Sequence, residues 1–170
     1  MNLDQNKKVL FLTDIENGLE PILQEVTNIR PDNMLTIQNY DSDISYPYGD
    51  IMRSVIIAIY QENVEEILVV GTKDKRTSTV NVLTQLELRK DKIKTLDYLF
   101  QNSMPEFSGG TVDEWLNGKE DISENIEKSV NTIRHHPLVP SYVKVRGLIV
   151  NNKGEKFSIL EVPPNKTNLT

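Results

Sequence analysis

Apolar runs of strand length alternate with segments of helical periodicity along the first half of this chain, and this alternation limits its fold more than any other feature. Residues 9–13 and 67–70 are short apolar runs, as in buried parallel strands. Residues 19–28 have apolar side chains at helical spacing, and a second strand is predicted at 34–38. Another helix follows, with Asp50 as its predicted cap. Strands separated by helices predict an α/β fold, with a parallel sheet, right-handed crossovers and helices on both faces.

The second half of the chain has weaker signals. We predict helices over 77–88, over 92–100 and from Asp121 onward, a mostly loop segment over 101–118, and strands over 143–150 and 156–160. Asp121 and Glu124 match a capping box at the start of the last helix. The two final strands are predicted to form a hairpin or to add one strand to the sheet.

Length and composition favour one globular domain. A chain of 170 residues with 38% hydrophobic content can bury one core, so we expect a single domain over 1–162 and a tail over 163–170. The net charge of −6 argues against a nucleic-acid partner. With no run approaching the roughly 20 apolar residues of a membrane-spanning helix and no signal peptide, we expect no membrane insertion and a cytoplasmic location. The absence of Cys excludes disulfides and thiolate ligands.

Polar residues that follow the predicted strands are the candidates for function. Parallel α/β sheets bind ligands at the carboxyl ends of their strands, which here are residues 14–18, 39–47 and 71–76. The first and third segments are adjacent if their strands are neighbours.

The segment VLFLTDIENGLEPIL resembles the first strand and turn of β-class carbonic anhydrases, where a Cys-x-Asp-x-Arg motif occurs. In this resemblance Asp14 falls on the Cys, Glu16 on the Asp and Gly18 on the Arg. The segment GDIMRSVIIAIYQENVEEILVVGTKDKRTS is similar to the family's next helix and strand, which end in Gly-His-Thr-x-Cys-Gly. Gly71 is kept, whereas Thr72 replaces the His.

The same motif continues with Lys75 in place of the second Cys and Arg76 in place of the Gly. The ending HPLVPSYVKVRGLIVNNKGEKFSIL is similar to the family's terminal turn and strands. Because the three segments follow in the family's order over nearly the whole chain, the chain is identified as a degenerate member of that family.

The resemblance implies a parallel four-stranded sheet with an additional C-terminal edge strand, assembled as a homodimer or a higher homo-oligomer. In the family, two thiolates and one imidazole hold zinc, which activates a water for attack on carbon dioxide. Thr72 is a poor zinc ligand and Lys75 is cationic, so only Asp14 could still coordinate. We therefore predict no metal, no cofactor and no carbonic anhydrase activity.

The changed positions form one degenerate pocket in this resemblance. Its members are Asp14, Glu16, Gly18, Gln38, Asn39, Thr72, Asp74, Lys75 and Arg76. We hypothesise that the Lys75 ammonium replaces the lost zinc and pairs with Asp14 and Glu16.

Three functions are compatible with such a pocket. The first is an inactive carbonic-anhydrase-like protein that binds or regulates a protein partner, in connection with inorganic-carbon metabolism. The second is a metal-free or altered enzyme that uses Asp14, Glu16 and Lys75 as acid-base groups. The third is a protein that binds a small anion, bicarbonate or phosphate, at Lys73 and its basic neighbours.

Several other residues are better explained by structure than by chemistry. His135 and His136 are predicted to cap the end of a helix rather than to bind metal. Trp115 is predicted to anchor local packing. The acidic residues Glu62, Glu65 and Glu66 are predicted to form a solvated face. Tyrosines 40, 46 and 48 either belong to an interface or fill the core.

Overall fold

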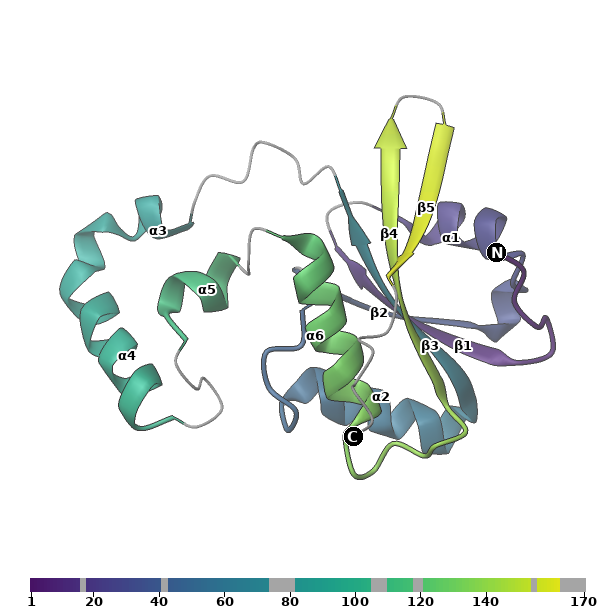
Figure 1. Ribbon diagram of the computed structural model, residues 1–170, viewed down its shortest axis with the longest axis horizontal. Coiled ribbons are helices and arrows are strands. Elements are labelled where there is room, and N and C mark those ends of the chain that lie inside the picture. The colour runs from purple at the N-terminus through teal and green to yellow at the C-terminus, as the bar shows by residue number, and fades with distance from the viewer. Residues whose placement is uncertain are drawn as a thin grey trace, which may run out of the picture.

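The structure of the chain is a computed structural model. It describes residues 1–15, 18–40, 43–73, 82–104, 110–117, 121–153 and 156–162. The described part consists of a sheet covered by helices and a separate group of short helices beside it (Figure 1).

The centre of the molecule is one five-stranded sheet with the order β2-β1-β3-β4-β5. Its strands are β1 Lys8–Asp14, β2 Met34–Asn39, β3 Val64–Thr72, β4 Lys144–Lys153 and β5 Lys156–Val162. The first four strands are parallel, and β5 pairs antiparallel with β4 along the edge. This arrangement confirms the predicted α/β fold, with four parallel strands and an additional C-terminal edge strand.

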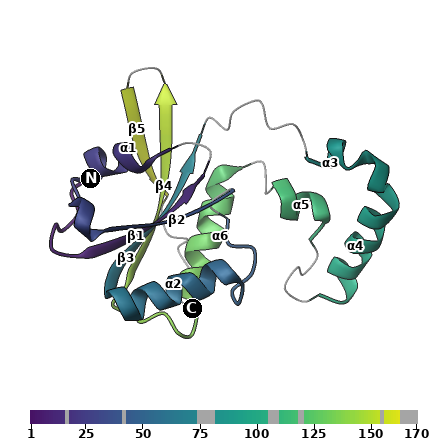
Figure 2. The ribbon, with the colours of Figure 1, turned by 180° about the vertical axis from the view of Figure 1, so that it is seen from behind.

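Three helices cover the two faces of the sheet. They are α1 Glu20–Thr27, α2 Asp50–Glu62 and α6 Ile122–Arg134. Buried side chains of α2 and α6 pack in one apolar cluster with the sheet, and the α1 segment contributes to a second cluster on the other face. Figure 2 shows α1 and α2 on opposite sides of the strands.

The buried strands are apolar along their length because helices cover both faces of the sheet. In β1, Leu10 and Leu12 belong to the cluster of α2 and α6, whereas Val9 and Phe11 belong to the cluster of α1. Successive side chains of a strand point to opposite faces, and here both faces are dry. Such a strand needs apolar residues at every position.

Two glycines let α6 lie directly on the sheet. A Cβ atom at Gly71 would stand 2.8 Å from Cδ1 of Ile122 and 2.9 Å from Cδ1 of Ile126. A Cβ atom at Gly147 would collide with Ile126 and stand 3.2 Å from Cβ of Val162. Position 147 therefore requires glycine while α6 keeps its place, whereas a Cβ atom at position 71 would require the ends of the two isoleucine side chains to shift.

A smaller helical lobe follows β3. It comprises α3 Val82–Gln85, the 3₁₀ turn Glu87–Arg89, α4 Lys90–Asn102 and α5 Val112–Asn117. Figure 1 shows these helices standing apart from the sheet, with α5 between α4 and α6. We refer to residues 82–104 and 110–117 as the lobe.

The lobe is also where the sequence-based prediction fails. The helix expected over 92–100 is confirmed by α4, which starts at Lys90. Within the predicted helix 77–88, the described residues contain the single turn α3 and the first two residues of the 3₁₀ turn, and residues 77–81 lie outside the described part. The loop expected over 101–118 is wrong for Val112–Asn117. The first N–H of this helix donates to Oδ1 of the distant Asp97 at 2.7 Å, and the Thr111 hydroxyl accepts from the N–H of Glu114 at 3.1 Å, a local cap that the prediction overlooked.

The capping residue predicted from sequence is correct for α6 and wrong for α2. Oδ1 of Asp121 accepts from the N–H of Ser123 at 2.8 Å, so Asp121 caps α6 as predicted. Gly49, not Asp50, is the capping residue of α2, and Asp50 is its first helical residue. Among the described helices none has both the length and the apolar character needed to cross a membrane.

Candidate functional site

The carboxyl ends of β1, β2 and β3 bring three of the candidate residues to one edge of the sheet. Asp14 is the last residue of β1 and pairs with Asn39, the last residue of β2. The N–H of Ile15 donates to the Asn39 carbonyl at 2.9 Å and continues this pairing. Thr72 ends β3, which is the other neighbour of β1. The expected adjacency of the first and third strand ends is therefore present.

Asp14 and Thr72 are buried at this edge. Their exposed fractions are 7% and 6%, and both take part in interactions within the chain. Gln38 is exposed and Asn39 is half-buried. The two positions that the resemblance aligns with the family's first Cys and its His are thus closed to solvent.

Gly18 has a backbone conformation that suits glycine. Its φ is +52°, in the left-handed region that side chains with a Cβ rarely adopt. The resemblance aligns an Arg with this position. An Arg here would be strained, although a Cβ atom would meet nothing within 4 Å.

Four members of the predicted pocket lie outside the described residues. They are Glu16, Asp74, Lys75 and Arg76. The pairing of Lys75 with Asp14 therefore stays a prediction.

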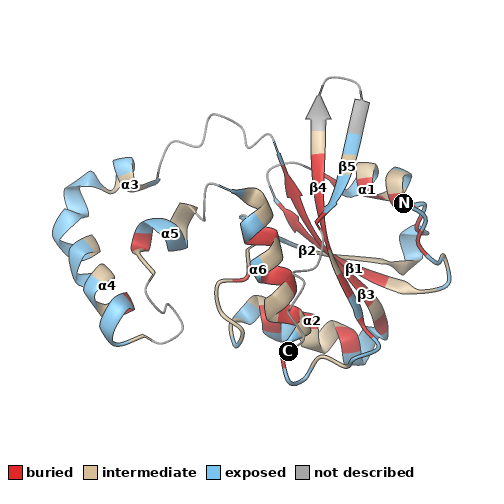
Figure 3. Ribbon diagram, viewed as in Figure 1, coloured by how far each residue is buried: buried red, intermediate tan, exposed pale blue. Residues whose placement is uncertain are grey.

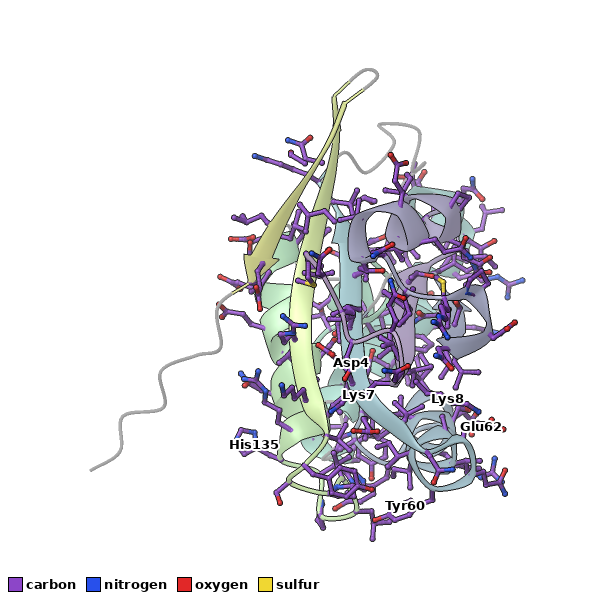
Figure 4. All side chains as sticks on the ribbon, turned by 90° about the vertical axis from the view of Figure 1, so that its right-hand side faces the viewer. Asp4, Lys7, Lys8, Tyr60, Glu62 and His135 are labelled. Atoms are coloured by element: carbon purple, nitrogen blue, oxygen red, sulfur yellow. The ribbon has the colours of Figure 1, made fainter. Side chains whose placement is uncertain are left out.

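The two histidines lie at the opposite end of the sheet, in the connection from α6 to β4. Nδ1 of His135 is 2.8 Å from the Asn131 carbonyl in the last turn of α6, which agrees with a capping role. His136 is only 5% exposed, and its Nδ1 accepts from the N–H of Leu138 at 3.2 Å. Figure 4 shows His135 near the start of β4, at the end of the molecule where Lys8 begins β1. Neither histidine is near Asp14.

The donor atoms at the matched positions do not fit the family's zinc ion. The chain has no Cys, and a carboxylate and a hydroxyl occupy the two matched positions that the structure describes. Within the described ranges, no three His, Cys, Asp or Glu residues are grouped so that they could hold a metal. Zinc in proteins prefers thiolate and imidazole ligands, and a neutral Thr hydroxyl is not among its usual donors.

Ion pairs gather at the amino end of the sheet instead. Lys8 pairs with Glu62 at 3.0 Å, and Lys7 pairs with Glu65 at 2.8 Å (Figure 4 labels both lysines and Glu62). The hydrogen bond to the Glu65 carboxylate is the main reason why the pKa of Lys7 is raised. Glu66 is buried and accepts from Arg146, so the predicted solvated face is wrong at Glu66.

The lobe has an apolar surface that the sequence analysis missed. Leu88 is fully exposed, and Tyr98 and Trp115 are 65% and 48% exposed. The Trp115 ring stands edge to face with Phe100 at 5.9 Å between ring centres, so it anchors local packing only in part. Figure 3 shows the lobe mostly in the colour of exposed residues. Helical periodicity over 82–100 would have marked Leu88 and Tyr98, but not Trp115, which lies in α5.

Comparison with known proteins settles the family. No family model matches the chain. It is 75% identical over 167 residues to a Bacillus subtilis protein named "Putative carbonic anhydrase-like protein YbcF", covering 98% of this chain and 94% of that protein. The crystal structure of β-carbonic anhydrase isoform I from Trichomonas vaginalis superposes with a TM-score of 0.62 at 19% identity, over 94% of this chain and 87% of that chain. The chain belongs to the β-carbonic anhydrase family.

More distant members of the family match as well. "Putative carbonic anhydrase YtiB" of Bacillus subtilis is 28% identical over 161 residues, which cover 91% of this chain and 81% of that protein. This family membership confirms the resemblance drawn from the three sequence segments.

Proposed function

We propose that this member of the β-carbonic anhydrase family has no zinc-dependent hydration activity and acts by binding a protein partner. The observation that carries the proposal is the donor set at the carboxyl edge of the sheet. Asp14 and Thr72 stand at the ends of neighbouring strands, where the resemblance aligns a zinc-binding Cys and His. A hydration catalyst of this family needs zinc to lower the pKa of its bound water. A chain without thiols lacks two of the three ligands.

The state of these side chains supports the same proposal. Asp14 and Thr72 are buried and engaged within the chain, so they behave as structural residues. The position that aligns with the family's Arg is a glycine with φ of +52°. The changes therefore extend beyond the metal ligands.

We extend this proposal to a role in inorganic-carbon metabolism. It rests on the chemistry of the family alone, because a fold does not determine a function. The chemistry of the family does not identify the partner, so the partner is described below by the surface of this chain that would bind it.

The first test is zinc analysis of the purified protein, combined with a stopped-flow carbon dioxide hydration assay. We expect far less than one zinc per chain and no rate above the uncatalysed reaction, before and after incubation with zinc. Stoichiometric zinc together with hydration activity would refute the proposal.

A back-substituted variant tests whether more than the ligands is missing. Asp14→Cys, Thr72→His and Lys75→Cys together restore the family's donor types at the aligned positions. We expect this triple variant to bind zinc and still to lack hydration activity, because Gly18 cannot become Arg without backbone strain. Full activity of the triple variant would show that only the ligands had been lost.

We further propose that the partner surface is the lobe and that its occupant is a second copy of this chain. Phe100 and Val112 are the only buried residues among those described in the lobe. The core of the lobe is therefore too small to bury its large apolar side chains, which include Leu88, Tyr98 and Trp115. Exposed aromatic and large apolar side chains are enriched at contacts between proteins.

Light scattering coupled to size-exclusion chromatography tests this interface. We expect a dimer for the native chain and a shift toward monomer for Leu88→Ser. Leu138→Ser is the matched control, because Leu138 is also exposed but belongs to the sheet domain. A native chain that is monomeric at all concentrations, or an equal effect of the two variants, would contradict the proposed interface.

A further inference from the structure

The outer side of helix α4 carries a stripe of exposed side chains. Asp91, Lys94 and Tyr98 follow one another at intervals of three and four residues, so they lie along one side of the helix. All three are exposed, and the exposed fraction of Tyr98 is 65%. Phe100, whose ring contacts Trp115 of α5, lies on the opposite side of the helix from Asp91. Figure 1 shows α4 on the side of the lobe that is farthest from the sheet, so this stripe is open to another molecule.

A hollow lies beside the start of this stripe. Its lining residues come from α3, the 3₁₀ turn and the first turn of α4, and they are Gln85, Leu88, Arg89, Asp91 and Lys92. Asp91 belongs both to the hollow and to the stripe, so the two form one continuous surface. Leu88 is fully exposed and gives the hollow an apolar side chain. The surface therefore combines a projecting ring, that of Tyr98, with a recess about two helical turns away.

Two charges of the stripe have no partner within this part of the molecule. Neither Asp91 nor Lys94 has an ion pair among the described residues, whereas the neighbouring Lys90 pairs with Glu87. A helix with two opposite charges three residues apart is complementary to a second copy that runs in the opposite direction, because each carboxylate then meets the ammonium of the other helix. A parallel copy would bring like charges together.

We propose that two copies of the chain dimerise through α4, with the two helices antiparallel and related by a two-fold axis. This inference rests on the lobe interface proposed above and specifies the side chains that form it. Asp91 of each copy pairs with Lys94 of the other, and the Tyr98 ring of each copy enters the hollow that Leu88 and Asp91 of the other copy line. The same patch serves both copies, as in any interface with two-fold symmetry.

The helical geometry allows both contacts at once. When Tyr98 of one helix lies level with position 89 of the other, Lys94 lies level with position 93, about 3 Å along the axis from Asp91. A lysine side chain spans this offset. Tyrosine is also among the residues that contribute most to binding between proteins, particularly where its ring fills a recess of the partner.

The test uses two charge variants of the full chain, alone and mixed, by light scattering coupled to size-exclusion chromatography. Asp91→Lys leaves two lysines on the stripe and Lys94→Asp leaves two carboxylates, so each variant alone should dimerise about tenfold more weakly than the native chain. An equimolar mixture brings opposite charges together again, so we expect a heterodimer about as tight as the native dimer. A mixture that dimerises no better than its components would overturn the proposal.

Two further variants serve as control and complement. Glu25→Lys makes the same change of charge at an exposed residue of α1 in the sheet domain, so it should dimerise like the native chain. Tyr98→Ala should weaken dimerisation both in the native chain and in the mixture of charge variants, and circular dichroism checks that α4 stays helical. Equal weakening by Glu25→Lys and Asp91→Lys would mean that net charge, not the stripe, controls the dimer, and would contradict the pairing.

These results also separate the pairing of α4 from the lobe interface itself. A native chain that is monomeric refutes both. A native dimer that Leu88→Ser dissociates and that Asp91→Lys leaves intact retains the lobe interface and refutes the antiparallel pairing of α4.

Discussion

The sheet domain and the lobe differ in how much of their apolar surface they bury. In the sheet domain both faces of β1 and β3 are dry, and the packing against α6 is close enough to require glycine at position 147. In the lobe, two buried residues hold together four short elements, while Leu88 is fully exposed. The contrast is visible in Figure 3, where buried residues concentrate on the strands and on the helices that cover them.

This difference assigns the stability of the fold to the sheet domain and the proposed function to the lobe. The two apolar clusters that cover the sheet hold the fold without a metal, whatever donor types stand at the strand ends where the resemblance places the family's ligands. The lobe leaves large apolar side chains in water, which is where the proposed partner would bind. The sheet domain therefore accounts for the fold, and the lobe is the place to look for the function.

The largest expected effect is that of Phe11→Ala in the sheet domain. Phe11 is fully buried in the cluster beneath α1. Truncation of such a residue typically lowers the free energy of unfolding by about 3–5 kcal/mol. Urea denaturation followed by far-ultraviolet circular dichroism measures this loss.

Phe100→Ala is the matched variant in the lobe, because Phe100 is also buried and only 4% exposed. We expect a loss below about 1 kcal/mol in the unfolding of the sheet, since few contacts of the sheet depend on Phe100. The fluorescence of Trp115, the only tryptophan, should change because its ring touches Phe100. Both variants are measured at low protein concentration, so that dimer dissociation does not contribute. Equal losses in the two variants would show that lobe and sheet unfold as one unit.

A smaller effect is expected where α6 approaches the sheet. Gly147→Ala introduces a Cβ atom that collides with Ile126, and overpacking of this kind typically costs about 1–3 kcal/mol. Ile126→Ala should cost less in the Gly147→Ala background than in the native chain, because it removes the colliding group. A double-mutant cycle by urea denaturation measures this coupling. Additive effects of the two changes would mean that α6 does not lie as close to β4 as described.

The strands and the α6 boundary could be predicted from sequence because their causes are local. Residues 9–13 and 67–70 are apolar at every position, as a strand with two buried faces requires. Asp121 marks the start of α6 through its own side chain. The sequence also predicted that Asp14 and Thr72 lie at the same end of the sheet, because each stands at the end of the apolar run of a parallel strand.

The features that were missed depend on contacts between distant residues. Glu66 lies in an acidic stretch, yet it is buried because Arg146 reaches it from the neighbouring strand. The strand predicted over 67–70 also left out the first residues of β3, because they include the acidic Glu65 and Glu66. The N–H of Val112, which begins α5, donates to Asp97, fifteen residues earlier, although the cap of α5 at Thr111 is local. No local pattern contains these pairs, so the amino end of the sheet and the lobe were the parts that the sequence described least well.

The smallest expected effect is that of Glu65→Gln, which removes the ion pair of Lys7 in the sheet domain. Glu65 raises the pKa of Lys7 above its ordinary value of 10.5, chiefly through their hydrogen bond. A raised lysine pKa contributes stability that is complete below 10.5 and is lost as the pH rises through the raised pKa. The native chain should therefore melt slightly higher than Glu65→Gln near neutral pH, and this difference should close in strongly alkaline buffer.

The matched variant in the lobe is Glu87→Gln, which removes the pair of Lys90 and Glu87, 2.7 Å apart. These side chains are about two-thirds exposed, against 37% and 45% for Lys7 and Glu65. Both pairs should weaken with added salt, because exposed charges are screened. Only the Lys7 pair joins the start of the chain to β3, so only its loss should lower the melting temperature of the sheet, followed by circular dichroism. A comparable drop for Glu87→Gln would mean that the lobe supports the sheet, and the separation of the two regions would have to be given up.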